Sequence, residues 1–189
     1  MINIFEKISK VNTTLIGYDS ISKPMVDKII EYIPNKSIIL SNNDLEIKNY
    51  LDSPAFYRDI KISNLLNVSD IYLILDISRI EFTDDDNDIS RSKLIRNLIT
   101  YIQKKMYESG DSETDSIKIK AVFMCEIFAK HENNVIIKHG THSIYVSDFV
   151  FYAKNNKLHL VKDRRGSGDE DQFDMRFISR DFQIDEILK

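Results

Sequence analysis

Cysteine, tryptophan, proline and glycine are all scarce in this chain of 189 residues, which has one cysteine, no tryptophan, three prolines and five glycines. Because Cys125 has no partner thiol, the chain can form no internal disulfide, which fits a reducing compartment. Isoleucine, asparagine, lysine and aspartate are used heavily instead. We take this usage as the trace of an AT-rich genome, such as that of a phage or a small parasite.

Long apolar runs and a leader pattern are also missing. No apolar stretch approaches the roughly 20 residues that span a bilayer, and residues 1–7 lack the basic and apolar segments of a signal peptide. We therefore expect no membrane partner and a cytoplasmic location, or the host cytoplasm if the protein is viral. The net charge of -4 argues against nucleic-acid binding over the whole surface but leaves room for a local basic stripe.

Apolar periodicity predicts strands alternating with helices over one domain, residues 1–189. Alternation of this kind favours an α/β fold with a mostly parallel sheet flanked by helices, here closed by a C-terminal antiparallel β-meander. We expect strands at 12–18, 37–41, 71–77 and 117–128, the second of them buried, helices at 24–33, 43–51 and 89–108, a helical turn at 63–67, a loop at 130–142, and closing strands at 144–153, 158–163 and 173–178.

The first strand leads into a segment with the spacing of a phosphate-binding loop, G-x-x-x-x-G-K-[ST]. Gly17 and Lys23 occupy the first glycine and the lysine positions, and a predicted helix follows, as the motif requires. Ser22 replaces the second glycine, which hinders close approach to a phosphate. Pro24 replaces the hydroxyl residue and offers neither an amide N–H nor an oxygen for Mg²⁺. An ordinary turn with a chance lysine is the alternative interpretation.

Four residues that could line a site stand at or just after the ends of four predicted strands. They are Gly17, Asn43, Asp76 and Glu126. In parallel sheets, ligands bind beyond the carboxyl ends of the strands, so these residues could surround one crevice. Asp76 ends the most apolar strand. In nucleotide-hydrolysing proteins, the aspartate that orders Mg²⁺ also stands at the end of an apolar strand.

Other site chemistries find little support. The four histidines lack zinc-ligand spacing, and no second cysteine is present. The acidic run at 84–88 lacks the glycine and glutamate of a calcium-binding loop, which favours a solvated loop. No Ser-His-Asp or Cys-His arrangement stands out.

Basic residues crowd the end of one predicted strand of the meander. Lys162, Arg164 and Arg165 lie within four positions, where like charges repel unless an anion is present. A solvated basic turn balanced by nearby acidic residues is the alternative.

Taken in order, these segments resemble the RecA-type ATPase core, especially its DnaB-like replicative-helicase and RadA-like branches, from about residue 13 to residue 177. The resemblance implies that Lys23, with Gly17 and Ser22, lines a degenerate Walker A loop for ATP. It implies that Asp76 is the Walker B residue that holds Mg²⁺, and that Glu126 ends the sensor strand.

The same resemblance implies two further roles. Lys162 and Arg164 look like the K-x-R pair that reaches a neighbouring subunit's ATP. The segment 139–142 is similar to the loop that borders the DNA-facing pore. Candidate DNA contacts through phosphate are Lys130, Lys138, His139 and His142. Simple solvent exposure is the alternative for these four residues.

The departures from the family pattern fall on groups that act on ATP within one subunit. Ser22 and Pro24 alter the loop, and Asn43, near the place of the catalytic glutamate, cannot act as a base. Our leading hypothesis is a RecA-like protein of DNA replication or recombination with weakened or lost ATP hydrolysis, which assembles with itself or with a related ATPase, on DNA. Two alternatives remain: a divergent but active DNA-dependent ATPase, and a non-nucleotide interaction module that docks on a RecA-family partner.

Overall fold

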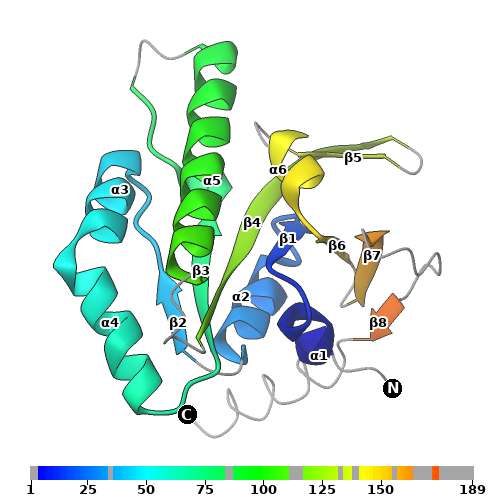
Figure 1. The fold of residues 1–189 in the computed structure, drawn as a ribbon. Helices are drawn as coiled ribbons and strands as arrows, with labels where there is room; N and C mark the ends of the chain where they lie inside the picture. Colours follow the sequence, from blue (N-terminus) through cyan, green and yellow to red (C-terminus); the bar gives the residue numbers. More distant parts are fainter. Residues whose placement is uncertain are drawn as a thin grey trace, which may run out of the picture.

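A computed structural model describes most of the chain, and its elements alternate between helix and strand (Figure 1). The described residues are 4–33, 36–83, 87–110, 117–131, 134–137, 141–154, 157–163 and 172–174. In chain order the elements are α1 (Ile4–Ser9), β1 (Thr13–Tyr18), α2 (Lys23–Glu31), β2 (Lys36–Ile39), α3 (Asp44–Asp52), α4 (Pro54–Leu65), β3 (Asp70–Asp76), the short 3-10 helix η1 (Ile77–Arg79), α5 (Asp88–Gly110), β4 (Lys118–His131), β5 (Asn134–Ile137), α6 (Thr141–Val146), β6 (Phe149–Lys154), β7 (Lys157–Asp163) and β8 (Gln172–Asp174).

One central sheet has the strand order β2-β3-β4-β1-β6-β7-β8, and β5 pairs with the far end of β4. The first five strands in that order run parallel, whereas β7 and β8 are antiparallel to their neighbours. The predicted α/β class with a mostly parallel central sheet is therefore confirmed. β1, which precedes the candidate loop, lies near the middle of the sheet between β4 and β6.

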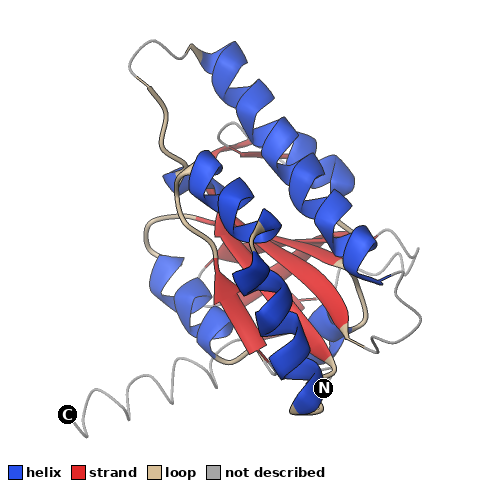
Figure 2. Cartoon of the chain, turned by 60° about the vertical axis from the view of Figure 1, so that its left-hand side comes forward, coloured by secondary structure: helices blue, strands red, loops and turns tan. Residues whose placement is uncertain are grey.

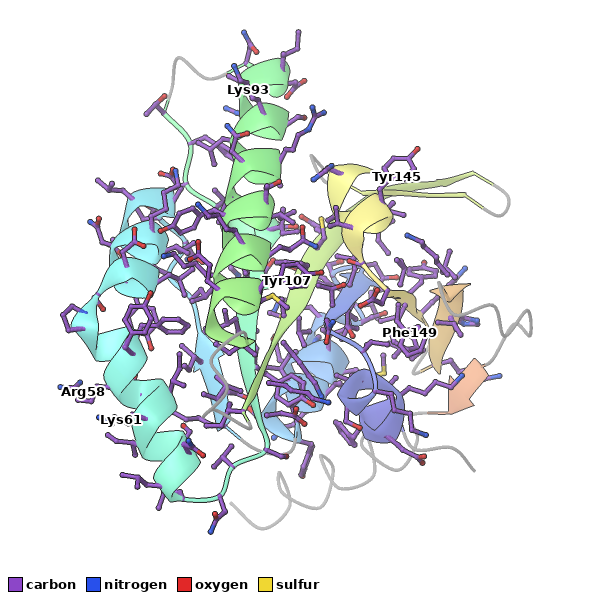
Figure 3. The ribbon with its side chains drawn as sticks, viewed as in Figure 1. Arg58, Lys61, Lys93, Tyr107, Tyr145 and Phe149 are labelled. Atoms are coloured by element: carbon purple, nitrogen blue, oxygen red, sulfur yellow. The ribbon has the colours of Figure 1, made fainter. Side chains whose placement is uncertain are left out.

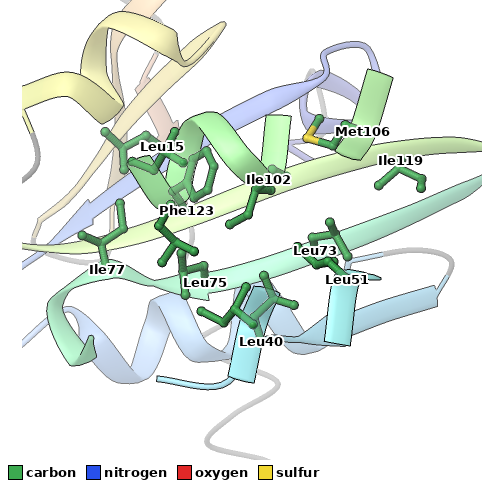
Figure 4. Packing of buried hydrophobic residues seen from close by; sticks show 14 of the residues in the cluster. Leu15, Leu40, Leu51, Leu73, Leu75, Ile77, Ile102, Met106, Ile119 and Phe123 are labelled. Atoms are coloured by element: carbon green, nitrogen blue, oxygen red, sulfur yellow. The ribbon is translucent and has the colours of Figure 1, made fainter. Parts of the chain in front are cut away.

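Helices cover both faces of the sheet, as Figure 2 shows, and each face has its own apolar core. Along β3, Leu73 and Leu75 face α3, α4 and α5, whereas Tyr72 and Ile74 face α1 and α2. Figure 4 shows the first of these cores, in which Phe123 packs among the leucines and isoleucines of the strands and helices. A strand buried on both faces needs apolar residues at every position, which explains the unbroken apolar run of β3.

Local capping explains where the helices on the edge side begin. The side chain of Asn43 accepts hydrogen bonds from the amides of Leu45 and Glu46 and caps α3. Ser53 caps α4 by accepting from the amide of Phe56, and Pro54 fills the first helical position, where no amide donor is needed. The capping residues thus separate α3 from α4 within a single stretch of chain.

The structure corrects several sequence expectations. β2 was expected to be buried, but it is the sheet's edge strand and Ile39 is 77% exposed. The expected turn at 63–67 is only the end of the twelve-residue α4. The expected loop at 130–142 contains β5, and α6 takes the first residues of the strand expected at 144–153. The short α1 had no predicted counterpart.

Among the described residues, no helix combines the length and apolar character needed to cross a bilayer.

Candidate functional site

β1 and β3 end on either side of β4, on the face covered by α2, whereas β4 continues past Glu126 to His131, so Glu126 does not end its strand as expected. Asp76 is the last residue of β3 and is only 8% exposed. Tyr18 is the last residue of β1, and it pairs in register with Glu126 of β4. Gly17, Asp76 and Glu126 therefore lie on three neighbouring strands, with β4 between the other two. That these residues surround one crevice with Asn43 stays a prediction.

The Asp76 carboxylate is held by four groups. The Tyr18 hydroxyl donates to both of its oxygens, at 3.0 and 2.9 Å. The Ser78 amide donates to Oδ1 at 3.2 Å. Lys23 Nζ and Arg79 Nε lie 3.7 and 3.4 Å from Oδ2. We call Tyr18, Lys23, Asp76, Ser78 and Arg79 the Asp76 cluster.

Lys23 and Tyr18 both interact with Asp76 in their present charge states. Lys23 also forms an ion pair with Asp27, one helical turn along α2, and its ammonium lies 5.1 Å from the centre of the Tyr18 ring. Burial, together with the negative charge of Asp76, raises the pKa of the Tyr18 phenol well above its ordinary value. The phenol therefore stays protonated at neutral pH and remains a hydrogen-bond donor to Asp76.

The backbone amides of the turn between β1 and α2 donate hydrogen bonds within the turn itself. The amides of Ser22 and Lys23 donate to the backbone carbonyl of Asp19, at 3.1 and 3.0 Å, and the Ser22 amide also lies 2.7 Å from the Asp19 carboxylate. Ser22 is buried, and its hydroxyl has no hydrogen-bond partner within the described residues. In a phosphate-binding loop, amides such as these point at the anion. Here Asp19 takes that place.

Gly17 lies inside β1 rather than in the loop. It pairs with Cys125 of β4 and Tyr152 of β6. A Cβ at this position would approach Ile127 Cδ1 to 3.1 Å, so the glycine makes room for the side chain of Ile127. The loop proper is the four residues from 19 to 22, because α2 begins at Lys23.

Ser78 connects the Asp76 cluster to β4. Its hydroxyl lies 3.6 Å from Cys125 Sγ and accepts a hydrogen bond from the Glu126 amide. The Glu126 side chain itself is exposed. Asn43 also lies at this edge, but it caps α3, and its amide nitrogen donates to Glu81 at 3.4 Å.

The contacts that Asp76, Lys23 and the loop amides already make determine whether ATP and Mg²⁺ fit this site. As arranged, the oxygens of Asp76 accept from protein donors, Lys23 has two carboxylate partners, and the loop amides bind Asp19. No group of three or more potential metal ligands occurs within the described ranges, and residues 84–86 of the acidic run lie outside them. The described groups therefore do not fit a magnesium triphosphate in this conformation.

Lys162, the predicted trans-acting lysine, contacts its own chain. Its ammonium donates to the carbonyls of Ile144, Tyr145 and Ser147, at 2.6, 3.1 and 3.1 Å. It thereby satisfies carbonyls at the end of α6, where a cation also complements the helix dipole. Arg164 lies outside the described residues.

The four candidate DNA contacts are not brought together by the described parts of the chain. Lys130 is in β4, and Lys138 and His139 lie outside the described residues. His142 is a half-buried residue of α6, and its Nε2 is buried without a hydrogen-bond partner among the described residues. Burial, then the charge of Arg96, lowers the pKa of His142.

Sequence reasoning singled out Asp76 and Lys23 but missed Tyr18 and Arg79. The position of Arg79, three residues after Asp76, is the only local signal for its ion pair. Tyr18 reaches Asp76 from a strand that is not adjacent to β3, so no local pattern could reveal the contact.

No family model and no curated protein matches the sequence. Among solved structures, a similar one belongs to a protein of Pyrococcus horikoshii OT3. It is 14% identical with a TM-score of 0.46, and the alignment covers 90% of this chain and 98% of that one.

Proposed function

We propose that this chain is a RecA-like α/β core protein of DNA replication or recombination that has lost efficient ATP hydrolysis. In this proposal it acts by assembling on DNA, with copies of itself or with an ATPase of related fold. The sheet supports the proposed RecA-like core. It is mostly parallel, β1 with its following loop lies near the middle, and polar residues stand at strand ends on one edge.

The observation that carries the proposal is the closed Asp76 cluster. Lys23 and Asp76, the two groups that would have to bind phosphate and Mg²⁺, lie 3.7 Å apart and interact with each other. Tyr18 and Arg79 satisfy the rest of the carboxylate. Admitting a magnesium triphosphate would require breaking these contacts and freeing the amides that bind Asp19.

A missing base supports the same conclusion. Asn43 caps a helix and has no acid–base chemistry to offer. A positioned general base typically contributes about 10²–10⁴-fold to rate, so its loss alone would leave turnover very slow.

The test is an ATPase assay on the purified full chain with Mg²⁺, with and without single-stranded DNA. We expect no turnover above the buffer rate, and the same result for Lys23→Ala and for the control Lys28→Ala, five residues farther along α2. Sedimentation with single-stranded DNA should show assembly that is independent of ATP. Saturable hydrolysis that disappears in Lys23→Ala alone would overturn the proposal in favour of a divergent active ATPase.

The contacts of Lys162 favour a second candidate, the non-nucleotide interaction module. A lysine that donates to three carbonyls of its own chain is poorly placed to reach a neighbour's ATP. If the chain completes a neighbour's site, replacing both Lys162 and Arg164 by alanine lowers the ATPase rate of a bound RecA-family partner. An interaction module leaves that rate unchanged.

A further inference from the structure

The outer edge of β2 offers unpaired backbone groups. Within the part of the chain that the structure describes, β2 is the last strand on its side of the sheet and pairs only with β3. The Leu40 amide donates to the carbonyl of Ile74 in β3, at 2.8 Å. Because the direction of the amides alternates along a strand, the N–H and C=O groups of Ser37 and Ile39 point away from β3. An edge of this kind is a template for another strand.

A hollow of about 220 Å³ borders this edge, between β2 and α3. Its walls are mainly apolar, and Glu46 is the one charged residue that lines it. The lining residues are Ile38, Ile39, Leu40, Ser41, Glu46, Ile47 and Tyr50. Ile39, which is 77% exposed, stands beside the hollow as an aliphatic side chain without cover.

We propose that a second copy of this chain binds here, by antiparallel pairing of the two β2 strands around a two-fold axis. The register that uses all outward-facing groups places Ser37 opposite Ile39 of the partner subunit, and Ile39 opposite the partner's Ser37. Each such pair exchanges two hydrogen bonds, and Ile38 then faces the partner's Ile38 across the axis. The two sheets become one continuous sheet, and two open edges disappear.

Charge at the two ends of β2 favours this antiparallel arrangement. Lys36 begins the strand, and Glu46 lies at its other end, where its carboxylate is hydrogen-bonded to Ser41. In the proposed register Lys36 lies opposite Leu40 of the partner subunit, next to the partner's hollow. In the single chain the Lys36 ammonium lies 3.8 Å from Asp59 Oδ1 of α4. In the dimer the aliphatic stem covers the apolar walls, and the ammonium turns from Asp59 to the partner's Glu46. The same contact forms twice, as an isologous interface requires.

This inference specifies the self-assembly part of the proposed function, but it depends on different residues from the Asp76 cluster. Its failure would leave the ATPase and Lys23 results untouched, and the reverse also holds. The other possible occupant of the edge, an extended segment of an unrelated protein, is distinguished by the experiment that follows.

The experiment is sedimentation velocity on the full chain over a concentration series, with charge-swapped variants. We expect a concentration-dependent dimer for the wild type. We expect at least about a tenfold rise in the dimer dissociation constant for Lys36→Glu and for Glu46→Lys, which each place like charges at both ends of the interface. A one-to-one mixture of the two variants restores opposite charges at both ends and should form a heterodimer of wild-type affinity.

Two further variants complete the design. Ser37→Pro removes one outward-facing N–H and should therefore abolish the dimer. The monomer should still fold, because proline is tolerated on an edge strand. Lys61→Glu reverses a charge that projects from α4 away from the sheet (Figure 3) and should leave the dissociation constant unchanged.

Three results would overturn the proposal. They are a wild type that stays monomeric throughout the series, a dimer that is indifferent to both charge reversals, and a mixture that fails to recover the affinity. Since misfolded chains cannot be rescued by mixing, recovery would also show that both single variants are folded.

Discussion

Tyr18 and Asp76 lie on strands that are not neighbours, yet the phenol hydroxyl donates to both carboxylate oxygens across the intervening strand β4. Strands two apart in a sheet are separated by about 9.6 Å, a gap that a tyrosine side chain can bridge. Both residues face α2, so the same contact fixes the end of β1 relative to the end of β3 and brings Lys23 close to the carboxylate.

The Tyr18→Phe substitution should therefore destabilise the fold. It removes a neutral side-chain donor from the buried carboxylate of Asp76, and a hydrogen bond to a charged group contributes about 1.5–3 kcal/mol. Urea denaturation should show a loss of this size in the free energy of unfolding. Tyr32→Phe, at the exposed end of α2, is the matched control and should change little. Equal effects of the two substitutions would contradict this role of Tyr18.

Lys162→Met should loosen α6. The substitution keeps the aliphatic stem but removes the donor to three carbonyls at the end of that helix. We expect a loss of about 1–3 kcal/mol and faster amide hydrogen exchange in α6. Lys157→Met, an exposed position on the same strand, should have neither effect. If α6 exchanges at the wild-type rate in Lys162→Met, the lysine has another role.

Lys120 and Asp70 form a buried ion pair at the opposite edge of the sheet, with Nζ and Oδ1 2.8 Å apart. The Lys120 side chain is almost fully buried and also donates to the carbonyl of Ser9. Lys120→Met should cost about 3–5 kcal/mol, because it leaves the carboxylate buried and unpaired. The double variant Lys120→Met, Asp70→Asn should recover part of this loss in urea unfolding.

The exposed pair between Lys104 and Glu108 on α5 supplies the comparison, at 3.5 Å. Lys104→Met should cost about 1 kcal/mol or less, since solvent screens a surface pair. A Lys120→Met cost that is no larger than the Lys104→Met cost would show that Asp70 finds other partners.

His142 should make the stability depend on pH between neutral and mildly acidic conditions. Its pKa lies below the ordinary value of 6.5 because burial, and then Arg96, disfavour the charged imidazole. As the pH falls through 6.5, the unfolded chain takes up the proton first, so the stability contributed by His142 is complete above 6.5 and is lost toward the lower pKa of the folded state. Thermal unfolding from pH 7.5 to pH 5 should show a steeper decline for the wild type than for His142→Gln. Parallel curves would mean that the imidazole can be protonated in the folded protein without cost.

The order of the main elements could be predicted from local patterns because periodicity and capping are local properties. The run at Ile71–Asp76 could only be a buried strand, and the apolar positions at Met25, Ile29 and Ile30 indicated α2. The exposure of β2 could not be predicted, because a short apolar run such as residues 38–40 looks the same at the edge of a sheet as at its centre. β5 and α6 were missed because each is too short to show a period.

The candidate site was predictable in its members but not in their contacts. Lys23 stood out because it has the place of the lysine in a phosphate-binding loop, and Asp76 because it ends an apolar strand, where parallel sheets bind ligands. Whether Lys23 faces an open loop or a carboxylate depends on Asp27 and Asp76, and the second of these lies 53 residues farther along the chain. The contacts of Lys162 could not be predicted either, because they are carbonyls at the end of α6, a helix that the local pattern did not predict.

The sequence by itself determined the α/β class, the absence of an internal disulfide and the erosion of the loop at Ser22 and Pro24, because these depend on residue identity and short-range order. Only the tertiary structure decided that Tyr18, Lys23 and Arg79 close over Asp76, and that β2 is the outermost of the described strands on its side of the sheet. Both features depend on which strands become neighbours, and that is set by the burial of two apolar cores over the whole sheet rather than by any single segment.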